Sequence, residues 1–462
     1  MASRFVDGEL ESVTEYTPMK RALFLLMVLS ASAQAMWGQA AQNPTPGTFF
    51  GENLSANTFS AGYAWPAPPM GAIRLWDSGT RWNQIETSQG NYTWTTFDAW
   101  LAAAAANNVD VTYTFGPGTP TFYSNGSSST CSYSPSSVCG PPGGAGCTLS
   151  GNPYACWDAW VSALVARANG KIKYWEGWNE FDIGQNYPQP ADVPTMIVLM
   201  IRANGIIKTS CPTCVFVSPA IADGDFSSGG IMGRYLSGGG AAISDIVAFH
   251  GYIGYSSYAE PEAIASRISS AKALMNANGL SGHELWDTEA SWGHDSNLAS
   301  APTCSGGLNS CGAGWLARNY LIHWSNGISR YYWYGYSHTS QIGTLWTPTP
   351  TANPGTLNPA GTAYGEVYNW IVGSTLTTPC ASSSNTYTCG LTLSNGSQAL
   401  AVWSTAGSAS YAPAALFTQY KDLTGATHAV IGSITIGYAP VLFFGAGTTP
   451  PLPPTNLKAT VQ

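Results

Sequence analysis

The sequence has few charged residues and no cluster of basic ones. Of its 462 residues only 9% are charged, and the formal net charge is −8. A nucleic acid or an anionic membrane requires a concentrated basic footprint on its partner, so the composition excludes both as partners. Since few charges are available, the surface must consist largely of Gly, Ser, Thr, Asn and Tyr. Such a surface suits an extracellular protein.

The sequence also lacks an apolar run long enough to cross a bilayer. The apolar run at 22–29 is far shorter than the roughly 20 residues of a spanning helix. It follows two basic residues and precedes small-x-small cleavage patterns, which predicts a signal peptide over residues 1–35, with Met19 as an alternative start. The mature chain should then begin close to Met36. A membrane-anchored helix is the weaker interpretation.

Sequence signals for phosphate and zinc sites are missing as well. No glycine-rich strand-to-helix loop carries the lysine of a phosphate cradle. The Cys-Pro-Thr-Cys at 211–214 has no second CxxC and no histidine pair at zinc-finger spacing. We therefore expect neither a metal nor a cofactor, and a zinc site is the weaker alternative for the cysteines.

Ten cysteines are present, which in an exported protein implies disulfide bonds. Closure of a short loop costs the least chain entropy, so bridges between close neighbours are predicted. The five close pairs are Cys131/Cys139, Cys147/Cys156, Cys211/Cys214, Cys304/Cys311 and Cys380/Cys389.

Short β-branched and aromatic runs alternate with helical patterns over most of the chain, which is typical of βα units around a parallel sheet. Eight strands are predicted, at residues 47–54, 71–77, 109–115, 172–179, 215–220, 246–252, 284–289 and 330–336. Helices are predicted at residues 96–106, 157–168, 194–208, 261–277, 315–326 and 360–372. The connection between the first two strands is expected to be a long loop. The fold class is α/β, a (β/α)8 TIM barrel at residues 36–373.

The helical period disappears after residue 373. Alternating runs of strand type follow, at residues 391–393, 399–403, 429–436 and 441–444. They predict a small C-terminal β-sandwich at residues 374–447, followed by a Pro-rich tail at 448–462. The short Gly-Ser connection leaves the sandwich little freedom, so we expect it to pack on the barrel as a structural partner.

Two glutamates stand at the ends of predicted strands. Glu180 belongs to YWEGWNEFD at 174–182, and Glu289 belongs to ELWDTEASWG at 284–293. Active sites of barrels lie at the C-terminal ends of the strands, so both side chains are expected to enter one cleft. Glycosidic cleavage requires such a pair, one group to protonate the leaving oxygen and one to attack or to activate water. A surface position for either acid is the alternative.

With Asn-Glu ending the fourth strand and Thr-Glu ending the seventh, the sequence resembles clan A glycoside hydrolases, nearest to family 39-like enzymes, over most of residues 47–372. The resemblance implies a retaining mechanism with Glu180 as acid/base and Glu289 as nucleophile. Many clan members have proline after the acid/base, where this sequence has Phe181. The resemblance also implies these substrate-binding residues: Arg74, Asn179, His250, Tyr252 and Trp333.

Individual roles follow from the same resemblance. Asn179 would contact the sugar 2-hydroxyl, Trp333 would form the floor of the site, and Arg74 would pair with the nucleophile. The charge of Arg74 should lower the pKa of Glu289, whereas burial and repulsion should raise the pKa of Glu180. For Trp292, in a loop on the catalytic face, stacking on a sugar and packing are equal alternatives.

Two further acids, Glu176 and Asp287, precede the glutamates of the pair on the same strands and are expected to be structural. The expected function is that of a secreted, monomeric hydrolase of β-glycosidic bonds. It would act on a polysaccharide or oligosaccharide by double displacement through a covalent glycosyl-enzyme. A catalytically inactive carbohydrate-binding barrel and a transglycosylase with the same site are the alternatives.

Overall fold

The computed structural model describes residues 43–445 apart from 56–64, 67, 124–136, 139, 144–145, 300, 302–307, 336–341 and 348–354. The predicted signal peptide, the start near Met36, the tail, Cys131, Cys139 and Cys304 lie outside these residues, as does most of the loop between the first two strands. Within the described residues, every helix is too short or too polar to cross a membrane.

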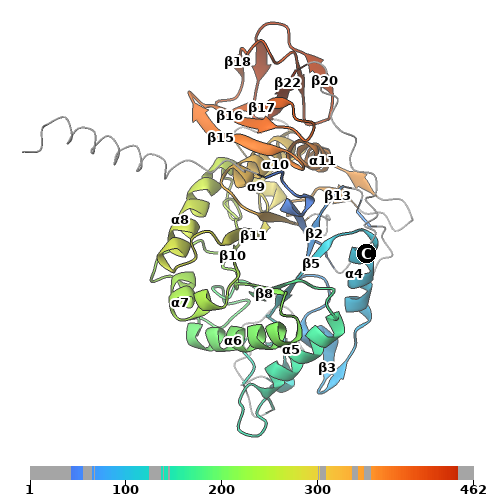
Figure 1. Ribbon diagram of the computed structural model, residues 1–462, viewed down its shortest axis with the longest axis vertical. Helices are drawn as coiled ribbons and strands as arrows, with labels where there is room; N and C mark the ends of the chain where they lie inside the picture. The colour runs from blue at the N-terminus through green and yellow to red at the C-terminus, as the bar shows by residue number, and fades with distance from the viewer. Residues whose placement is uncertain are drawn as a thin grey trace, which may run out of the picture. The chain divides into compact units, whose positions relative to one another are not determined.

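Eight parallel strands close into a barrel, as predicted (Figure 1). Around the barrel the order is β1-β12-β11-β10-β9-β8-β5-β2, so each strand pairs with its neighbour in the chain and β12 closes on β1. The strands are β1 (Phe50–Asn53), β2 (Ala72–Leu75), β5 (Asp110–Phe115), β8 (Tyr174–Trp178), β9 (Val215–Val217), β10 (Ile246–Phe249), β11 (Glu284–Ala290) and β12 (Arg330–Tyr334). The predicted strand positions are therefore confirmed.

Helices form a ring outside the barrel strands (Figure 1). All six predicted helices are present. Three short helices, α3, α7 and α9, were not predicted; they have 4, 7 and 5 residues, and α7 has glycines at both ends. The helices are α3 (Trp82–Ile85), α4 (Thr95–Ala106), α5 (Ala155–Ala168), α6 (Val193–Ser210), α7 (Ile231–Ser237), α8 (Ile264–Ala277), α9 (Asp295–Ala299), α10 (Leu308–Ser325) and α11 (Pro359–Ile371).

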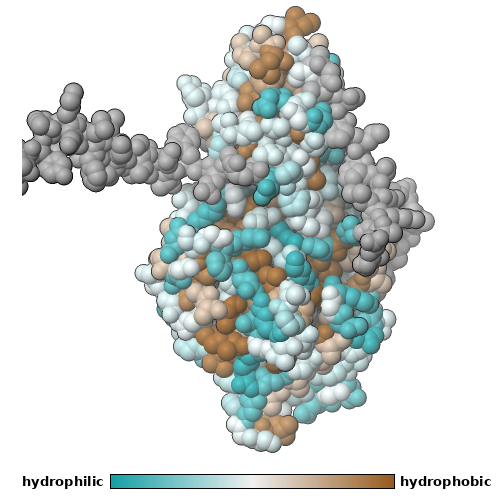
Figure 2. All heavy atoms as spheres, viewed as in Figure 1, coloured by the Kyte–Doolittle hydropathy of each residue, from teal (hydrophilic) through white to brown (hydrophobic). Residues whose placement is uncertain are grey.

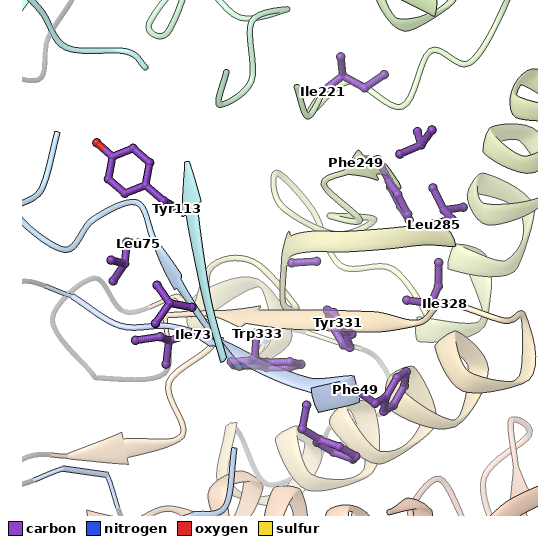
Figure 3. Close-up of a cluster of buried hydrophobic side chains, with 14 of the residues drawn as sticks. Phe49, Ile73, Leu75, Tyr113, Ile221, Phe249, Leu285, Ile328, Tyr331 and Trp333 are labelled. Atoms are coloured by element: carbon purple, nitrogen blue, oxygen red, sulfur yellow. The ribbon is translucent and has the colours of Figure 1, made fainter. Parts of the chain in front are cut away.

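The barrel core has an outer and an inner part, because successive side chains of a strand point to opposite faces. Outward side chains such as Ile73, Leu285 and Tyr331 pack against the helices (Figure 3). Inside the barrel, the guanidinium of Arg330 lies 4.2 Å from the ring centre of Tyr174 and 4.5 Å from that of Trp286. These large groups fill the N-terminal end of the barrel, so polar side chains gather at the other end.

The C-terminal region forms the predicted β-sandwich. A six-stranded antiparallel sheet, in the order β15-β16-β17-β22-β19-β20, faces the pair β18-β21. The predicted strand at 429–436 is wrong, because these residues belong to two strands in different sheets, separated by a turn with Gly432 at φ 68°. The strands are β15 (Thr375–Ser383), β16 (Thr386–Thr392), β17 (Gln398–Ser404), β18 (Ala409–Tyr411), β19 (Gln419–Lys421), β20 (Thr427–Ala429), β21 (Ile434–Ile436) and β22 (Val441–Phe444).

One face of the six-stranded sheet packs against the barrel helices. Its buried Leu376, Leu391 and Trp403 belong to the same hydrophobic cluster as the barrel core. The indole of Trp403 donates a hydrogen bond of 2.8 Å to Oε1 of Glu262, and the backbone N–H of Cys380 donates one of 2.7 Å to Ser325. These contacts support a structural role for the sandwich.

Replacement of Trp403 by alanine should therefore destabilise the whole protein. The indole is fully buried and stacks on Tyr387 at 4.9 Å. Loss of a buried tryptophan costs about 3–5 kcal/mol, because a cavity remains. Urea denaturation would measure the change in free energy of unfolding. Ile431→Ala is the control in the same sandwich, since Ile431 is 85% exposed and should contribute little. Equal effects of the two substitutions would contradict the interface.

Three predicted disulfides are confirmed: Cys147–Cys156, Cys211–Cys214 and Cys380–Cys389. Cys311 is disulfide-bonded as well, and the described part of the chain contains no free cysteine. The alternative of a zinc site at the Cys-Pro-Thr-Cys of 211–214 is therefore wrong, since both cysteines form a disulfide with each other.

The surface mixes polar and apolar residues. On the face shown in Figure 2, hydrophobic residues occur in small groups among hydrophilic ones. Scattered apolar residues are normal on protein surfaces and mark no particular site.

Candidate active site

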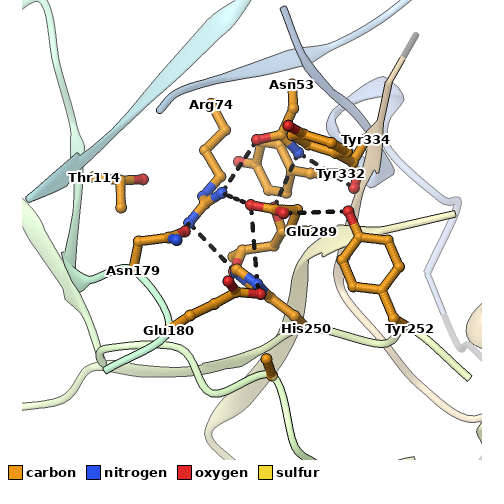
Figure 4. Close-up of polar contacts among 12 residues, drawn as sticks. Asn53, Arg74, Thr114, Asn179, Glu180, His250, Tyr252, Glu289, Tyr332 and Tyr334 are labelled. Carbon is orange, nitrogen blue, oxygen red and sulfur yellow. Dashed lines mark hydrogen bonds and ion pairs between the residues drawn. The ribbon is translucent and has the colours of Figure 1, made fainter. Parts of the chain in front are cut away.

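Six of the eight residues assigned to the site from sequence lie together at the C-terminal ends of the barrel strands (Figure 4). They come from β2, β8, β10 and β11 and from the residues directly after these strands. Because parallel strands of a barrel end at one rim, residues far apart in sequence meet there. The six are Arg74, Asn179, Glu180, His250, Tyr252 and Glu289.

Glu289 is held by two donors. Nη1 of Arg74 donates to its Oε2 at 2.7 Å, and the hydroxyl of Tyr252 donates to its Oε1 at 3.2 Å. The β11–β12 register shifts between Asp287 and Ala290, so Glu289 lies in an irregular part of the strand. Such irregularities redirect side chains next to active sites. The carboxylate is thereby oriented, and its side chain keeps 8% of its surface exposed.

Glu180 lies two residues beyond β8, in a sharply turned backbone. Its φ of +44° is in the left-handed region, which few residues other than glycine adopt and which is common at functional sites. Its Oε1 lies 2.8 Å from Nδ1 of His250, and its Oε2 accepts a hydrogen bond of 2.9 Å from Asn186. Phe181, which replaces the proline of many clan A enzymes, is fully buried against Tyr187 and Tyr235.

The two glutamates and His250 form one compact group. One carboxylate oxygen from each glutamate and one imidazole nitrogen all lie within 4.8 Å of one another. Ligand atoms at this spacing could hold a cation. However, Arg74 already places its positive charge against Glu289, and this charge disfavours a cation beside it.

The two carboxyl groups have opposite pKa shifts, and the directions are the reverse of those expected from sequence. Burial, together with repulsion from Glu180, raises the pKa of Glu289 to about 7, against the charges of His250 and Arg74. Burial would raise the pKa of Glu180 too, but its hydrogen bond and charge interaction with His250 lower it below the ordinary value. Burial would lower the pKa of His250, but the charge of Glu289 and the bond to Glu180 raise it.

The structure also explains why the expectation for Glu289 was wrong. Nε of Arg74 donates a hydrogen bond of 2.5 Å to Oε2 of Glu176. One guanidinium charge is thus divided between two carboxylates, and it does not outweigh the burial of Glu289. Glu176 thus faces the inside of the barrel and has Arg74 as its partner, in agreement with the structural role expected from sequence.

The structure does not bring Trp333 or Trp292 to the site, so the proposed floor at Trp333 is wrong. Trp333 points outward from the barrel, its indole donates to the carbonyl of Gly343 at 2.7 Å, and its ring lies parallel to that of Tyr320 at 6.1 Å (Figure 3). Trp292 is buried with its ring 5.1 Å from Trp333 and donates to Asp295 at 2.7 Å. Both tryptophans are therefore packing residues.

Tyr334 is the β12 residue at the rim. Its hydroxyl donates a hydrogen bond of 2.6 Å to Asp77, and its ring lies 6.3 Å from that of Tyr252 (Figure 4). Adjacent residues of a strand face opposite sides, so a shift of one position exchanges Trp333 for Tyr334. The period-two pattern of the strand was the signal for this residue. Asn186, in a loop after β8, carried no recognisable signal.

Asp287 connects the two strands that carry His250, Tyr252 and Glu289. Its Oδ1 accepts the backbone N–H of Gly251 at 3.0 Å and that of Glu289 at 3.4 Å, and its Oδ2 lies 2.9 Å from Nε2 of His323. A Cβ atom on Gly251 would lie 1.9 Å from Oδ2 of Asp287, so only glycine fits there. This placement agrees with a structural role for Asp287.

Comparisons with known proteins support the architecture. No protein-family model and no curated protein matches the sequence. Similar solved structures include a glucosidase from Croceicoccus marinus, with a TM-score of 0.55 and 11% identity over 88% of this chain and 97% of its own. The catalytic domain of a family 30 xylanase C from Talaromyces cellulolyticus has a TM-score of 0.53 and 13% identity, over 89% of this chain and 98% of its own.

A family 44 xyloglucanase from Paenibacillus polymyxa is also similar, with a TM-score of 0.53 and 11% identity over 88% of this chain and 98% of its own. At these identities the likeness shows that the chain has the barrel fold of these enzymes.

Proposed function

We propose that this protein is a secreted retaining glycoside hydrolase that cleaves β-glycosidic bonds in a polysaccharide or oligosaccharide. The observation that carries the proposal is the carboxylate pair, with an oxygen of Glu180 and an oxygen of Glu289 within 4.8 Å of one another. Retaining enzymes hold the two carboxyl groups roughly 5–5.5 Å apart, and inverting enzymes hold them roughly 6.5–9.5 Å apart. The short separation favours retention.

In the proposed first step, Glu289 attacks the anomeric carbon while Glu180 protonates the leaving oxygen. The glycosidic bond breaks, and a covalent glycosyl-enzyme forms. Arg74 and Tyr252 orient the attacking carboxylate through their hydrogen bonds. In the second step, Glu180 accepts a proton from water, and the resulting hydroxide attacks the same carbon. Glu289 is released, and the configuration of the sugar is retained.

His250 is placed to move the proton that this chemistry requires. The reactive form needs a proton on Glu180 and a charge on Glu289, the reverse of the distribution favoured in the substrate-free protein. Nδ1 of His250 lies 2.8 Å from Glu180 and 3.9 Å from Glu289. The imidazole can therefore pass a proton directly to Glu180, whereas Glu289 lies beyond hydrogen-bond distance of it.

Other observations support the remaining parts of the proposal. Disulfides persist in oxidising compartments, so the three bridges support secretion. Nη2 of Arg74 donates a hydrogen bond of 2.7 Å to Oδ1 of Asn179, and this contact supports the assignment to clan A. Within that clan, we propose that the protein is family 39-like. Because both catalytic carboxylates are in place and oriented, the site favours an enzyme over an inactive binding barrel. We expect the enzyme to act as a monomer.

A panel of plant and microbial polysaccharides, incubated with the purified protein, tests the proposal. Product sizing would identify the substrate, and NMR of the first product would show its anomeric configuration. We expect β-linked glycans to be cleaved with retention. Cleavage with inversion would contradict the mechanism, and binding of glycans without cleavage would contradict the activity.

The pH profile should have its acid limb near neutrality. A nucleophile must be ionised, and burial raises the pKa of Glu289 to about 7. For the free enzyme, kcat/KM should therefore rise with pH through about 7. It should fall again at higher pH, when the group of Glu180 and His250 loses the proton needed by the leaving oxygen. An acid limb below pH 5, where an ordinary glutamate titrates, would contradict this prediction.

A further inference from the structure

Arg74 is a single buried cation shared by two acids. Its side chain is fully buried, and its guanidinium makes ion pairs of 2.5 Å with Glu176 and 2.7 Å with Glu289. Nη2 donates to Asn179 at 2.7 Å, and Nη1 donates to Asn53 at 3.2 Å as well. The guanidinium can therefore turn very little, and Glu176 determines which edge it presents to Glu289.

Glu176 lies below the reacting groups, inside the barrel. It belongs to β8, four residues before Glu180, and its side chain is completely buried. Its Oε2 also accepts a hydrogen bond from the hydroxyl of Thr114 on β5. Its Oε1 has no hydrogen-bond partner among the described residues. A carboxylate that is buried in this way acts on the site through Arg74 and not by contact with a sugar.

We propose that Glu176 is a positioning residue that divides the charge of Arg74 and thereby sets the pH at which Glu289 becomes an ionised nucleophile. This inference deepens the proposed function, because it concerns the same site. Two effects of Glu176 raise the pH at which Glu289 loses its proton. Glu176 draws the guanidinium charge away from Glu289, and its own negative charge repels that of Glu289.

Other titratable or charged groups surround Glu289, and Glu176→Gln leaves them unchanged. They are Arg74 on β2, Asp77 after β2, Glu180 after β8, His250 and Tyr252 after β10, Asp287 on β11 and Tyr334 on β12. Glutamine has nearly the shape of glutamate and still accepts from Nε of Arg74 and from Thr114. The substitution thus removes the charge and keeps the hydrogen bonds.

The test is an NMR titration of Glu289 in the full-length protein, whose glutamate carboxyls are labelled with ¹³C. The signal of Glu289 is assigned by its absence from the spectrum of Glu289→Gln. In Glu176→Gln, Glu289 should titrate at lower pH by about one unit or more, as expected for an unshared opposite charge at this distance. The acid limb of the kcat/KM profile should move by the same amount. At pH values above this limb, kcat should change only a few-fold. Thr114→Val is the matched control, because it removes one hydrogen bond of Glu176 and leaves the charge.

An unchanged or raised titration of Glu289 in Glu176→Gln would overturn the proposal, and so would an equal shift in Thr114→Val. If Glu176→Gln fails to fold, the wild-type titration decides, with Glu176 assigned through Glu176→Asp. Glu176 must already be a carboxylate at the pH where Glu289 loses its proton, and a protonated Glu176 there would overturn the proposal. The NMR titration needs no substrate, so it remains decisive if the protein cleaves no glycan.

Discussion

Glu289→Gly should abolish turnover of every substrate. Without the carboxylate no covalent glycosyl-enzyme can form, and loss of a nucleophile lowers kcat by on the order of 10⁴-fold or more. The vacated space lies next to Arg74 and Tyr252, which donate to the Glu289 carboxylate in the wild type. A small anion such as azide should therefore enter and restore cleavage, with inverted configuration in the glycosyl azide product.

Glu180→Ala should have a different signature. Substrates with highly activated leaving groups need no protonation, so their first step should be nearly spared. Natural glycans should lose a general-acid contribution of roughly 10²–10⁴-fold. A series of aryl glycosides with leaving groups of different pKa would separate the roles of the two glutamates.

Glu284→Gln is a matched control for both substitutions, since Glu284 is an exposed acid at the start of β11, the strand that carries Glu289. It should leave the kinetics unchanged. Identical leaving-group behaviour of Glu289→Gly and Glu180→Ala would show that the roles are wrongly assigned, and activity retained in Glu289→Gly would refute the covalent mechanism.

Arg74→Leu should have the second largest effect, on stability as well as on activity. Removal of one partner from a buried ion pair costs about 3–5 kcal/mol, because the remaining charge is uncompensated. Here both Glu176 and Glu289 would lose their cation. Because the charge of Arg74 no longer opposes the effect of burial, the pKa of Glu289 in the folded variant should rise further above that of the unfolded chain.

The sign of the pH dependence follows from this raised pKa. A folded state that holds an extra proton is favoured at low pH, and this advantage is lost as pH rises through the folded-state pKa. Since the pKa of Glu289 is already about 7 in the wild type, the deficit of Arg74→Leu should be small near pH 5, where Glu289 is protonated in both proteins, and should grow from about pH 7 toward pH 9. Urea denaturation of the variant and the wild type at both pH values would measure it.

Arg167→Gln provides the control, because Arg167 pairs with Asp98 at the exposed surface, where salt bridges contribute little. It should change the free energy of unfolding very little at either pH. A deficit of Arg74→Leu that does not depend on pH would indicate lost packing instead of uncompensated carboxylates.

Much of the barrel could be predicted because its strands are local features. In a parallel barrel, each strand is typically a short apolar run between helices, and β9 and β10 are of this kind. A polar residue that ends such a run lies at the rim, which is why Glu180 and Glu289 could be assigned together, whereas Arg74 was implied only by the family resemblance. Local disulfides were predictable for a similar reason, since short loops close most easily.

The position of Trp333 could not be taken from the resemblance alone. The eighth strand has aromatic residues at successive positions, Tyr331, Tyr332, Trp333 and Tyr334. Aromatic side chains fit either face of the strand, so the composition does not show which of them points toward the site. Pairing of β12 with β1 and β11 decides it, and it places Tyr334 at the rim and Trp333 against α10.

The barrel, the sandwich, three of the disulfides and the acids at the strand ends could be inferred from the amino-acid sequence, because each depends on a pattern within one short segment. The protonation of Glu180 and Glu289 could not be inferred in this way. It depends on the sharing of Arg74 between Glu176 and Glu289, and on His250 lying against Glu180. These groups are up to 215 residues apart in the chain, and their electrostatic energies depend on distance and burial, which exist only once the barrel has closed.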